Sequence, residues 1–239
     1  MRLTSFQRLA IWTTATTYLL ILVGGLVRAS GAGLGCPDWP RCFGSWIPPA
    51  SAADLPPQFD PSQFNPALMW TEYANRLLGV TVGFLILATA VSAWRHHRHQ
   101  RRILWTTVAA FLLVGFEGWL GGRVVAHELA AWIVTAHLIV AIVIVQLLLY
   151  ATVEATRPAG GAMLKTEGRL AMLLIVLTLV QAGVGTQVRG HLETAQGAGV
   201  AREVALSTVG RLDYLHRELA FGVLFGAALF ALWLLSRRS

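Results

Sequence analysis

The chain has 239 residues, of which 55% are hydrophobic and only 13% are charged, and its mean hydropathy is +0.59. An ordinary soluble domain is roughly 45–50% apolar and 25% charged, so this composition excludes one and indicates an integral membrane protein. The net charge of +7 would suit nucleic-acid binding in a soluble protein. Here the basic residues lie mostly at the ends of apolar segments, so no nucleic-acid partner is expected.

Six apolar segments are each long enough to cross a hydrocarbon core of roughly 30 Å as a helix. They are 9–27, 77–94, 103–121, 129–151, 170–188 and 219–235. The first segment is too long for a removable signal peptide and lacks a small-residue cleavage site. The sequence therefore predicts an all-α polytopic membrane protein with six transmembrane helices.

The charges between these segments predict which helix ends face the cytoplasm. If six helices alternate in direction, the basic residues of both termini and of the stretches 95–102 and 157–169 fall on one side. The positive-inside rule makes that side cytoplasmic, where the basic run at 95–102 would face anionic membrane lipid. We expect a multi-pass protein of the cell (plasma) membrane with cytoplasmic N- and C-termini and an extracytoplasmic loop at about 29–71.

Two short stretches occur twice, which predicts a duplicated membrane unit. EYANR at 72–76 corresponds to DYLHR at 213–217, and VGGLVR at 23–28 corresponds to VGTQVR at 184–189. In both copies of the first pair, an acidic residue stands three positions before a potential ligand, and an arginine follows that ligand directly. The ligand position is Asn75 in the first copy and His216 in the second. We expect a four-helix repeat over 1–153 and a second, two-helix half repeat over 154–239.

The two predicted outer loops have different features. The first holds the chain's two cysteines, Cys36 and Cys42. Oxidation is permitted outside the cytoplasm, and five intervening residues can close a small disulfide loop; two unpaired thiols are the alternative. A zinc site would need more ligands than this loop offers. In the second loop, at 190–212, the apolar and polar residues of 200–206 predict a short amphipathic helix.

Two polar side chains fall inside predicted helices. A carboxylate such as Glu117 costs roughly 2.5–3.5 kcal/mol inside a membrane, so it is a functional candidate, with snorkelling to the outer interface as the alternative. A lone histidine such as His137 is more often a packing residue than a ligand. However, His137 and position 75 lie at similar depth near the outer face. Two imidazoles that face each other across a helix bundle hold a haem iron from both sides, so His137 is a candidate axial ligand.

Arginines stand where the predicted helices meet the outer loops. Guanidinium groups pair well with carboxylates, and a haem upright in the outer leaflet would point its two propionates at that level. Snorkelling to the interface is the alternative, but it does not explain why an arginine follows each ligand position directly. The candidate propionate-binding residues are Arg28, Arg76, Arg123, Arg189 and Arg217.

Four stretches, spread over nearly the whole chain, carry a resemblance to a known family. They are SGAGLGCPDWPRC at 30–42, EYANR at 72–76, LGG at 120–122 with His137 after it, and DYLHR at 213–217. In these stretches the sequence resembles the haem A synthases, membrane enzymes that oxidise haem O for cytochrome oxidase. The string that contains the cysteines is the most specific of the four.

The resemblance implies an eight-helix protein of two four-helix halves, each of which holds one haem between two histidines. The amino-terminal half would take haem O as substrate, and the carboxy-terminal half would keep haem b as a cofactor. One methyl group of the porphyrin would become a formyl group through successive hydroxylations and loss of water. The resemblance also implies that Glu72 is the catalytic carboxylate, that His137 and His216 ligate haem iron, and that Cys36 and Cys42 form a disulfide.

The sequence departs from the family pattern in two respects. Asn75 stands where the family has a haem-binding histidine, and a carboxamide is a poorer iron ligand than imidazole. The sequence also has six apolar segments rather than eight, and no histidine follows His216. Each haem would then keep one axial histidine, as in globins and peroxidases. Three interpretations stay open: a shortened member completed by a second subunit or a homo-oligomer, a relative that binds haem without making haem A, and an altered or truncated form.

The expected function is haem A synthase-type oxidation of haem O, with haem O synthase and the terminal oxidase as expected partners. The alternative is a haem-binding oxidase-assembly or electron-transfer protein without synthase activity. A transporter built on duplicated helices is less favoured. The sequence shows no broken helix and no midplane charge pair, and its polar residues collect at the outer face.

Overall fold

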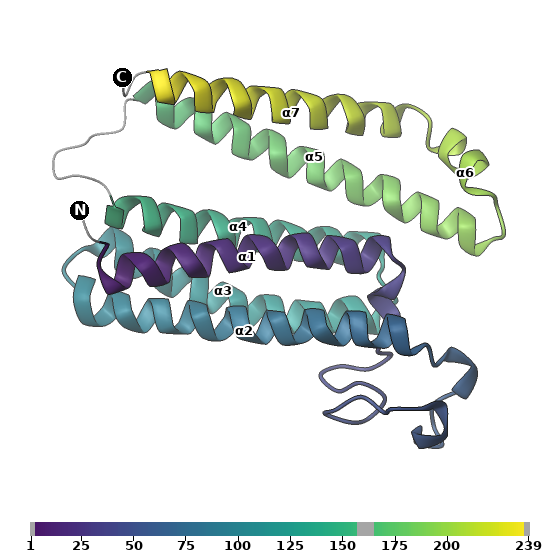
Figure 1. Cartoon of the computed structure of the whole chain (residues 1–239). Helices are drawn as coiled ribbons and strands as arrows, with labels where there is room; N and C mark the ends of the chain where they lie inside the picture. The colour runs from purple at the N-terminus through teal and green to yellow at the C-terminus, as the bar shows by residue number, and fades with distance from the viewer. Residues whose placement is uncertain (1–2, 157–164, 237–239) are drawn as a thin grey trace. The chain divides into compact units, whose positions relative to one another are not determined.

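A computed structural model describes residues 3–156 and 165–236 of the protein. Its fold is helical (Figure 1). Five of the helices formed by these residues are long and apolar enough to cross a membrane. They are α1 (Ser5–Ala29), α2 (Pro66–His97), α3 (Arg101–Ala126), α4 (Ala131–Thr156) and α5 (Lys165–Gly197), drawn in Figure 1. The prediction of an all-α, multi-pass membrane protein is confirmed at this level.

The predicted sixth span, 219–235, lies in α7 (Arg211–Ser236). Among the described residues, α7 is not one of the five helices that qualify as candidate spans. A six-span topology therefore stays a prediction.

The second helix, α2, begins well before the apolar segment that predicts it. Asn65 caps its amino terminus, because the Asn65 Oδ1 accepts from the amides of Ala67 and Leu68 at 3.1 and 3.2 Å. Pro66 follows at the first helical position, where a missing N–H costs nothing. The EYANR stretch at 72–76, which precedes the apolar segment 77–94, consequently lies inside the helix.

The chain forms two compact units. The first comprises residues 1–133 and 140–157, and the second comprises residues 134–139 and 158–239. The first unit therefore contains α1, α2, α3 and most of α4. The second contains α5, α6 (Arg202–Val209), α7 and a short piece of α4.

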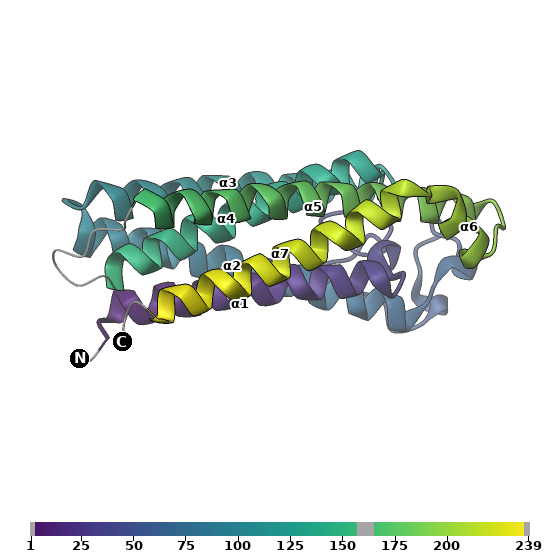
Figure 2. The same ribbon diagram turned by 90° about the horizontal axis from the view of Figure 1, so that it is seen from above.

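In the first unit, the helices lie side by side in both views (Figures 1 and 2). Their core includes Val82 and Ile86 of α2, Ala110 of α3, and Ile144 and Leu148 of α4. A second buried cluster joins the start of α1 to the end of α2 and the start of α3. It consists of Phe6, Ala10, Ala93 and Ile103, and the Phe6 ring lies 4.4 Å from the His97 ring.

Threonine hydroxyls tie α1 to two of its neighbours. The Thr13 and Thr89 hydroxyls lie 2.9 Å apart between α1 and α2, and those of Thr14 and Thr152 lie 3.1 Å apart between α1 and α4. All four side chains are buried. Because lipid gives helices little hydrophobic reason to associate, hydroxyl pairs of this kind help to fix which faces meet.

The long loop between α1 and α2 has a small core of its own. The loop contains three short 3-10 helices, at Ala32–Leu34, Ala52–Asp54 and Pro61–Gln63. Buried Cys36, Cys42, Phe43 and Met69 pack with the partly buried Leu55, Phe59, Phe64 and Tyr73. Asp60 caps the last turn, and the hydrogen bond from the Ser62 backbone N–H lowers the pKa of the Asp60 carboxyl. In Figure 1 this loop and the turn between α2 and α3 lie at opposite ends of the bundle.

In the second unit, α7 returns antiparallel to α5 after the short helix α6 (Figure 2). Val188 and Leu192 of α5 pack with Ala205 of α6, and Leu206, Val209 and Leu212 surround them. The short helix predicted around 200–206 is confirmed as α6, Arg202–Val209.

Candidate functional site

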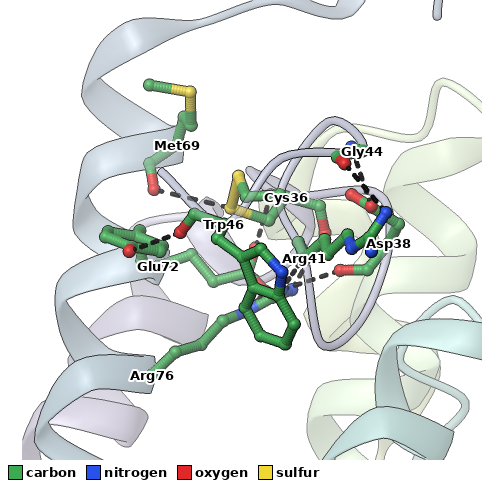
Figure 3. Close-up of a disulfide and its surroundings, with 10 residues drawn as sticks. Cys36, Asp38, Arg41, Gly44, Trp46, Met69, Glu72 and Arg76 are labelled. Atoms are coloured by element: carbon green, nitrogen blue, oxygen red, sulfur yellow. Dashed lines mark hydrogen bonds and ion pairs between the residues drawn. A yellow bond between two sulfur atoms is a disulfide. The ribbon is translucent and has the colours of Figure 1, made fainter. Parts of the chain in front are cut away.

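The loop between α1 and α2 is closed by a disulfide between Cys36 and Cys42 (Figure 3). Both cysteines are fully buried. The Cys42 N–H donates to the Ser45 carbonyl at 2.9 Å, and the Gly44 N–H donates to Asp38 Oδ2 at 2.9 Å. The residues between and just beyond the two cysteines therefore form a compact loop against the first turns of α2.

Glu72 of α2 points toward this disulfide loop (Figure 3). Its side chain is only 6% exposed. The Cys36 N–H donates to Glu72 Oε2 at 2.8 Å, and Arg76, one helical turn later, forms an ion pair with Glu72 Oε1. Both oxygens of the carboxylate thus have a partner, and one of these partners is the backbone of a disulfide-bonded cysteine.

The side chain of Arg76 on α2 binds main-chain carbonyls of the same loop. Its Nη1 donates to the carbonyls of Asp38 at 2.7 Å and Arg41 at 2.8 Å, and its Nη2 donates to the Cys36 carbonyl at 3.1 Å. Its Nε donates to Glu72 Oε1 at 3.1 Å. The side chain is 14% exposed. Arg76 therefore joins α2 to the carbonyls at both ends of the disulfide-closed segment.

Two glycines allow the loop to approach the helices closely. A Cβ on Gly35 would lie 2.4 Å from the Leu68 carbonyl oxygen in the first turn of α2. A Cβ on Gly122 of α3 would lie 2.8 Å from the Trp39 ring. Since real Cβ atoms do not come that close to other atoms, a side chain at position 35 would clash with backbone, and one at position 122 would require the Trp39 ring to move. Both glycines belong to the stretches that carry the family resemblance.

Asn75 lies beside this cluster on α2 and is half-buried. Its Oδ1 is buried and makes no hydrogen bond to any residue that the structure describes. Gly24 of α1 lies next to it, and a Cβ there would be at an ordinary contact distance of 3.9 Å from Asn75 Oδ1. A buried acceptor without a donor is uncommon in folded proteins and often marks a position where another group binds.

The other intramembrane candidates of the first repeat are half-buried on two different helices. Glu117 lies on α3, and His137 lies on α4 within the piece of that helix that belongs to the second unit. The pairing of His137 with position 75 across one bundle therefore stays a prediction.

His216 of α7 packs edge-on against α5. A Cβ on Gly185 would lie 2.4 Å from the His216 Cε1, so the glycine provides the space that the ring fills. The His216 Nδ1 lies 3.3 Å from the Gln181 main-chain carbonyl, which can only accept a hydrogen bond. The same Nδ1 lies 3.4 Å from the Gln181 side-chain Nε2, which can only donate, so the two contacts favour opposite tautomers. In the tautomer with the proton on Nδ1, the Gln181 carbonyl accepts and the lone pair is on Nε2. Many metal-bound histidines have this arrangement, in which one ring nitrogen donates to a carbonyl and the other ligates.

The arginines at the helix ends have local partners that the sequence analysis did not identify. Arg123 Nη2 lies 3.2 Å from His127 Nε2, and Arg189 Nε donates to Glu193 at 2.7 Å. Arg217 pairs with Asp213, as Arg76 pairs with Glu72. Arg28 is half-buried near the end of α1. The two residues of each pair are four apart along the chain, and all lie on helices except His127, which caps the end of α3. This spacing brings side chains together and is visible in the sequence.

The helices and the disulfide loop define the class: a multi-pass helical membrane protein with a disulfide-closed loop held against its second helix. The family model for COX15-CtaA, described as cytochrome oxidase assembly protein, matches residues 7–239. The chain belongs to this family, and the resemblance predicted from its motifs is confirmed.

Similar curated proteins carry the name "Heme A synthase". That of Alkalihalophilus pseudofirmus is 32% identical over 136 residues, covering 55% of this chain and 41% of its own length. Those of Bartonella quintana and Agrobacterium fabrum are 27% and 28% identical, covering 79% and 76% of this chain and 61% and 56% of their own lengths. The chain thus spans roughly two fifths to three fifths of the length of these relatives. No solved structure matches it.

Proposed function

We propose that this protein oxidises a ring methyl group of haem O to a formyl group, as a haem A synthase-type oxidoreductase for cytochrome oxidase biogenesis. Membership of the assembly family and the names of its relatives support this activity. Two successive hydroxylations of the same methyl carbon followed by loss of water would give the formyl group. We further propose six transmembrane helices, with a four-helix repeat over 1–153 and a half repeat over 154–239.

The observation that carries the proposal is the geometry of His216. In the tautomer whose Nδ1–H donates to the Gln181 carbonyl, Nε2 is the nitrogen that would ligate haem iron. Gly185 lets the ring lie close to α5, because a Cβ there would overlap it. His216, with Gln181 and Gly185 beside it, would therefore suit an axial ligand for haem b. Haem b would supply electron-transfer chemistry when bound. Arg217, the next residue, is 61% exposed and suits a haem propionate.

In the first repeat, we propose that His137 is the axial ligand for the iron of the substrate haem O. Glu72 would be the carboxylate that handles protons as the methyl group is oxidised. Its position on α2, beside Asn75 and the buried Oδ1 of that residue, supports a reacting centre near this level of the helix. Arg28 and Arg123 would hold propionates of this haem, and Arg189 would hold a propionate of the haem in the second repeat.

The membrane location and the partners of the protein follow from the same activity. We propose cytoplasmic termini in the cell membrane and a disulfide loop outside the cytoplasm, where oxidation of Cys36 and Cys42 is permitted. Haem O synthase would supply the substrate, and the terminal oxidase would receive the product.

One observation favours a second function, haem binding for oxidase assembly or electron transfer without synthase activity. Asn75 gives a carboxamide where an imidazole ligand is expected, and carboxamide oxygen is a weak ligand for haem iron. A chain with this function would bind haem and leave the ring methyl unchanged.

Co-expression with a haem O synthase, in a host that makes no haem A, tests the two functions against each other. Haems extracted from the membranes would be identified by mass. We expect haem A or its hydroxylated precursor with the chain present, and haem O alone with an empty vector. Unchanged haem O in the presence of well-expressed protein would reject the synthase function and favour the binding function.

A further inference from the structure

The guanidinium group of Arg76 has no hydrogen-bond donor to spare. An arginine side chain carries five N–H groups in a fixed planar fork. Two of them point at Glu72 Oε1, and the other three point at the carbonyls of Asp38, Arg41 and Cys36. Five donors thus meet five contacts on a side chain that is only 14% exposed. To bind an additional carboxylate, Arg76 would have to abandon one of these acceptors.

The corresponding arginine of the second copy is in a different situation. Arg217 also follows a potential ligand and also pairs with an acidic residue four positions earlier, Asp213. Yet the Arg217 side chain is 61% exposed, against 14% for Arg76. The two copies of the motif therefore share their sequence pattern but use their arginines differently. Arg217 can reach an anionic group, whereas Arg76 is committed to the protein's own backbone.

We propose that Arg76 is a positioning residue, which fixes the Glu72 carboxylate and the Cys36–Cys42 loop relative to each other, rather than a residue that binds a haem propionate. This inference rests on the proposed function, because it assigns Arg76 a role through Glu72. The contacts form a closed ring: Arg76 binds Glu72, Glu72 accepts from the Cys36 N–H, and the Cys36 carbonyl accepts from Arg76.

The disulfide is part of this arrangement. Arg76 binds the carbonyl of Cys36 and the carbonyl of Arg41, the residue directly before Cys42. The two carbonyls come from opposite ends of the segment that the disulfide closes, so the oxidised loop presents both to one guanidinium group. The carboxylate of Glu72 is consequently held in one orientation only while the loop is closed and Arg76 spans it.

Lysine at position 76 tests the proposal, with Arg217→Lys as the matched variant. Lysine keeps the charge but has three donors and no planar fork, so it cannot replace the five hydrogen bonds that Arg76 makes to four acceptor atoms. In Arg76→Lys we expect a water-soluble phosphine to reduce the Cys36–Cys42 disulfide about tenfold faster or more, because hydrogen bonds to a charged group are lost. Tagging the released thiols with a maleimide of known mass measures the rate. Arg217→Lys should leave this rate unchanged.

Kinetics with haem O separate positioning from propionate binding. In Arg76→Lys we expect kcat to fall about tenfold or more, with KM for haem O changed less than about twofold. In Arg217→Lys we expect KM to rise. Esterifying the two propionates of haem O should then weaken turnover by the same factor in wild-type protein and in Arg76→Lys, because residues that do not contact the propionates give additive effects.

Three results would overturn the proposal: an unchanged rate of disulfide reduction in Arg76→Lys, a KM increase in place of the kcat loss, or an ester penalty that disappears in that variant. If Arg76→Lys is not recovered from membranes, wild-type protein still gives a test. Haem O and its dimethyl ester should affect the reduction rate equally, and faster reduction with haem O alone would mean that propionates withdraw Arg76 from the loop. The reduction rates test the positioning role even if wild-type protein fails to oxidise haem O, so that failure would count against the proposed function alone.

Discussion

Replacing His216 with glycine is expected to remove most of the b-type haem from the purified protein, by about tenfold or more. The imidazole packs against Gly185, and its Nδ1 lies near the main-chain carbonyl and the side-chain amide of Gln181, so its position is fixed, and we propose it as the ligand of the second unit. Loss of groups that merely orient a metal ligand costs roughly 10–100-fold in metal affinity, and loss of the ligand itself should cost at least as much. Pyridine haemochrome spectra, normalised to protein, measure the haem content.

Glycine leaves a space into which free imidazole can enter, so added imidazole should restore haem to the His216→Gly variant. This rescue distinguishes a lost ligand from a lost fold. The matched control is His191→Gly, because His191 is an exposed histidine near the end of α5. Asn75→Ala should lower haem content less than His216→Gly does. Equal haem in the His216 and His191 variants would show that His216 is not a ligand.

Replacing Glu72 with glutamine is expected to reduce conversion of haem O by about 100-fold or more. A positioned general acid or base contributes roughly 10²–10⁴-fold to a reaction, and glutamine cannot exchange protons at this position. Glutamine keeps the size of the side chain and one oxygen that can accept from the Cys36 N–H. The ratio of product to haem O, measured by mass in the co-expression system, gives the effect. Glu203→Gln, at an exposed carboxylate on α6, is the control.

Glu72 also holds the disulfide loop, so the variant needs a second measurement. If the carboxylate takes part in the chemistry, turnover should fall while the Cys36–Cys42 disulfide stays as resistant to reduction as in Glu203→Gln. Full turnover with Glu72→Gln would exclude a proton-handling role. Lost turnover together with rapid reduction of the disulfide would assign Glu72 a purely structural role.

The sequence predicts the helices because long apolar segments are a local signal that needs no partner. It misplaces the start of α2, because the Asn65 cap and Pro66 lie within a polar stretch that looks like loop. Hydropathy alone starts this helix at residue 77, although the helix begins at Pro66 and already includes Glu72 and Arg76. A cap followed by proline is itself a recognisable start signal, and its use would have corrected the boundary.

The contacts around Arg76 were much harder to predict. Main-chain carbonyls accept its hydrogen bonds, and a carbonyl leaves no mark in the sequence because every residue has one. The spacing of Glu72 and Arg76 does predict their pairing on a helix. The threonine pairs between α1 and its neighbours were missed for a related reason. Single threonines such as Thr13 and Thr89 hardly interrupt an apolar pattern, and only packing brings their hydroxyls together.

The central claim is that the His216 imidazole ligates haem iron, and pulsed EPR of the ferric protein tests it most directly. The protein would carry His137→Ala and ¹⁵N-labelled histidine, so that the other proposed axial ligand cannot contribute. We expect ¹⁵N hyperfine coupling from one axial imidazole, and its disappearance when His216→Gly protein is loaded with haem and unlabelled imidazole. A haem-containing spectrum without ¹⁵N imidazole coupling in the protein that retains His216 would contradict the claim.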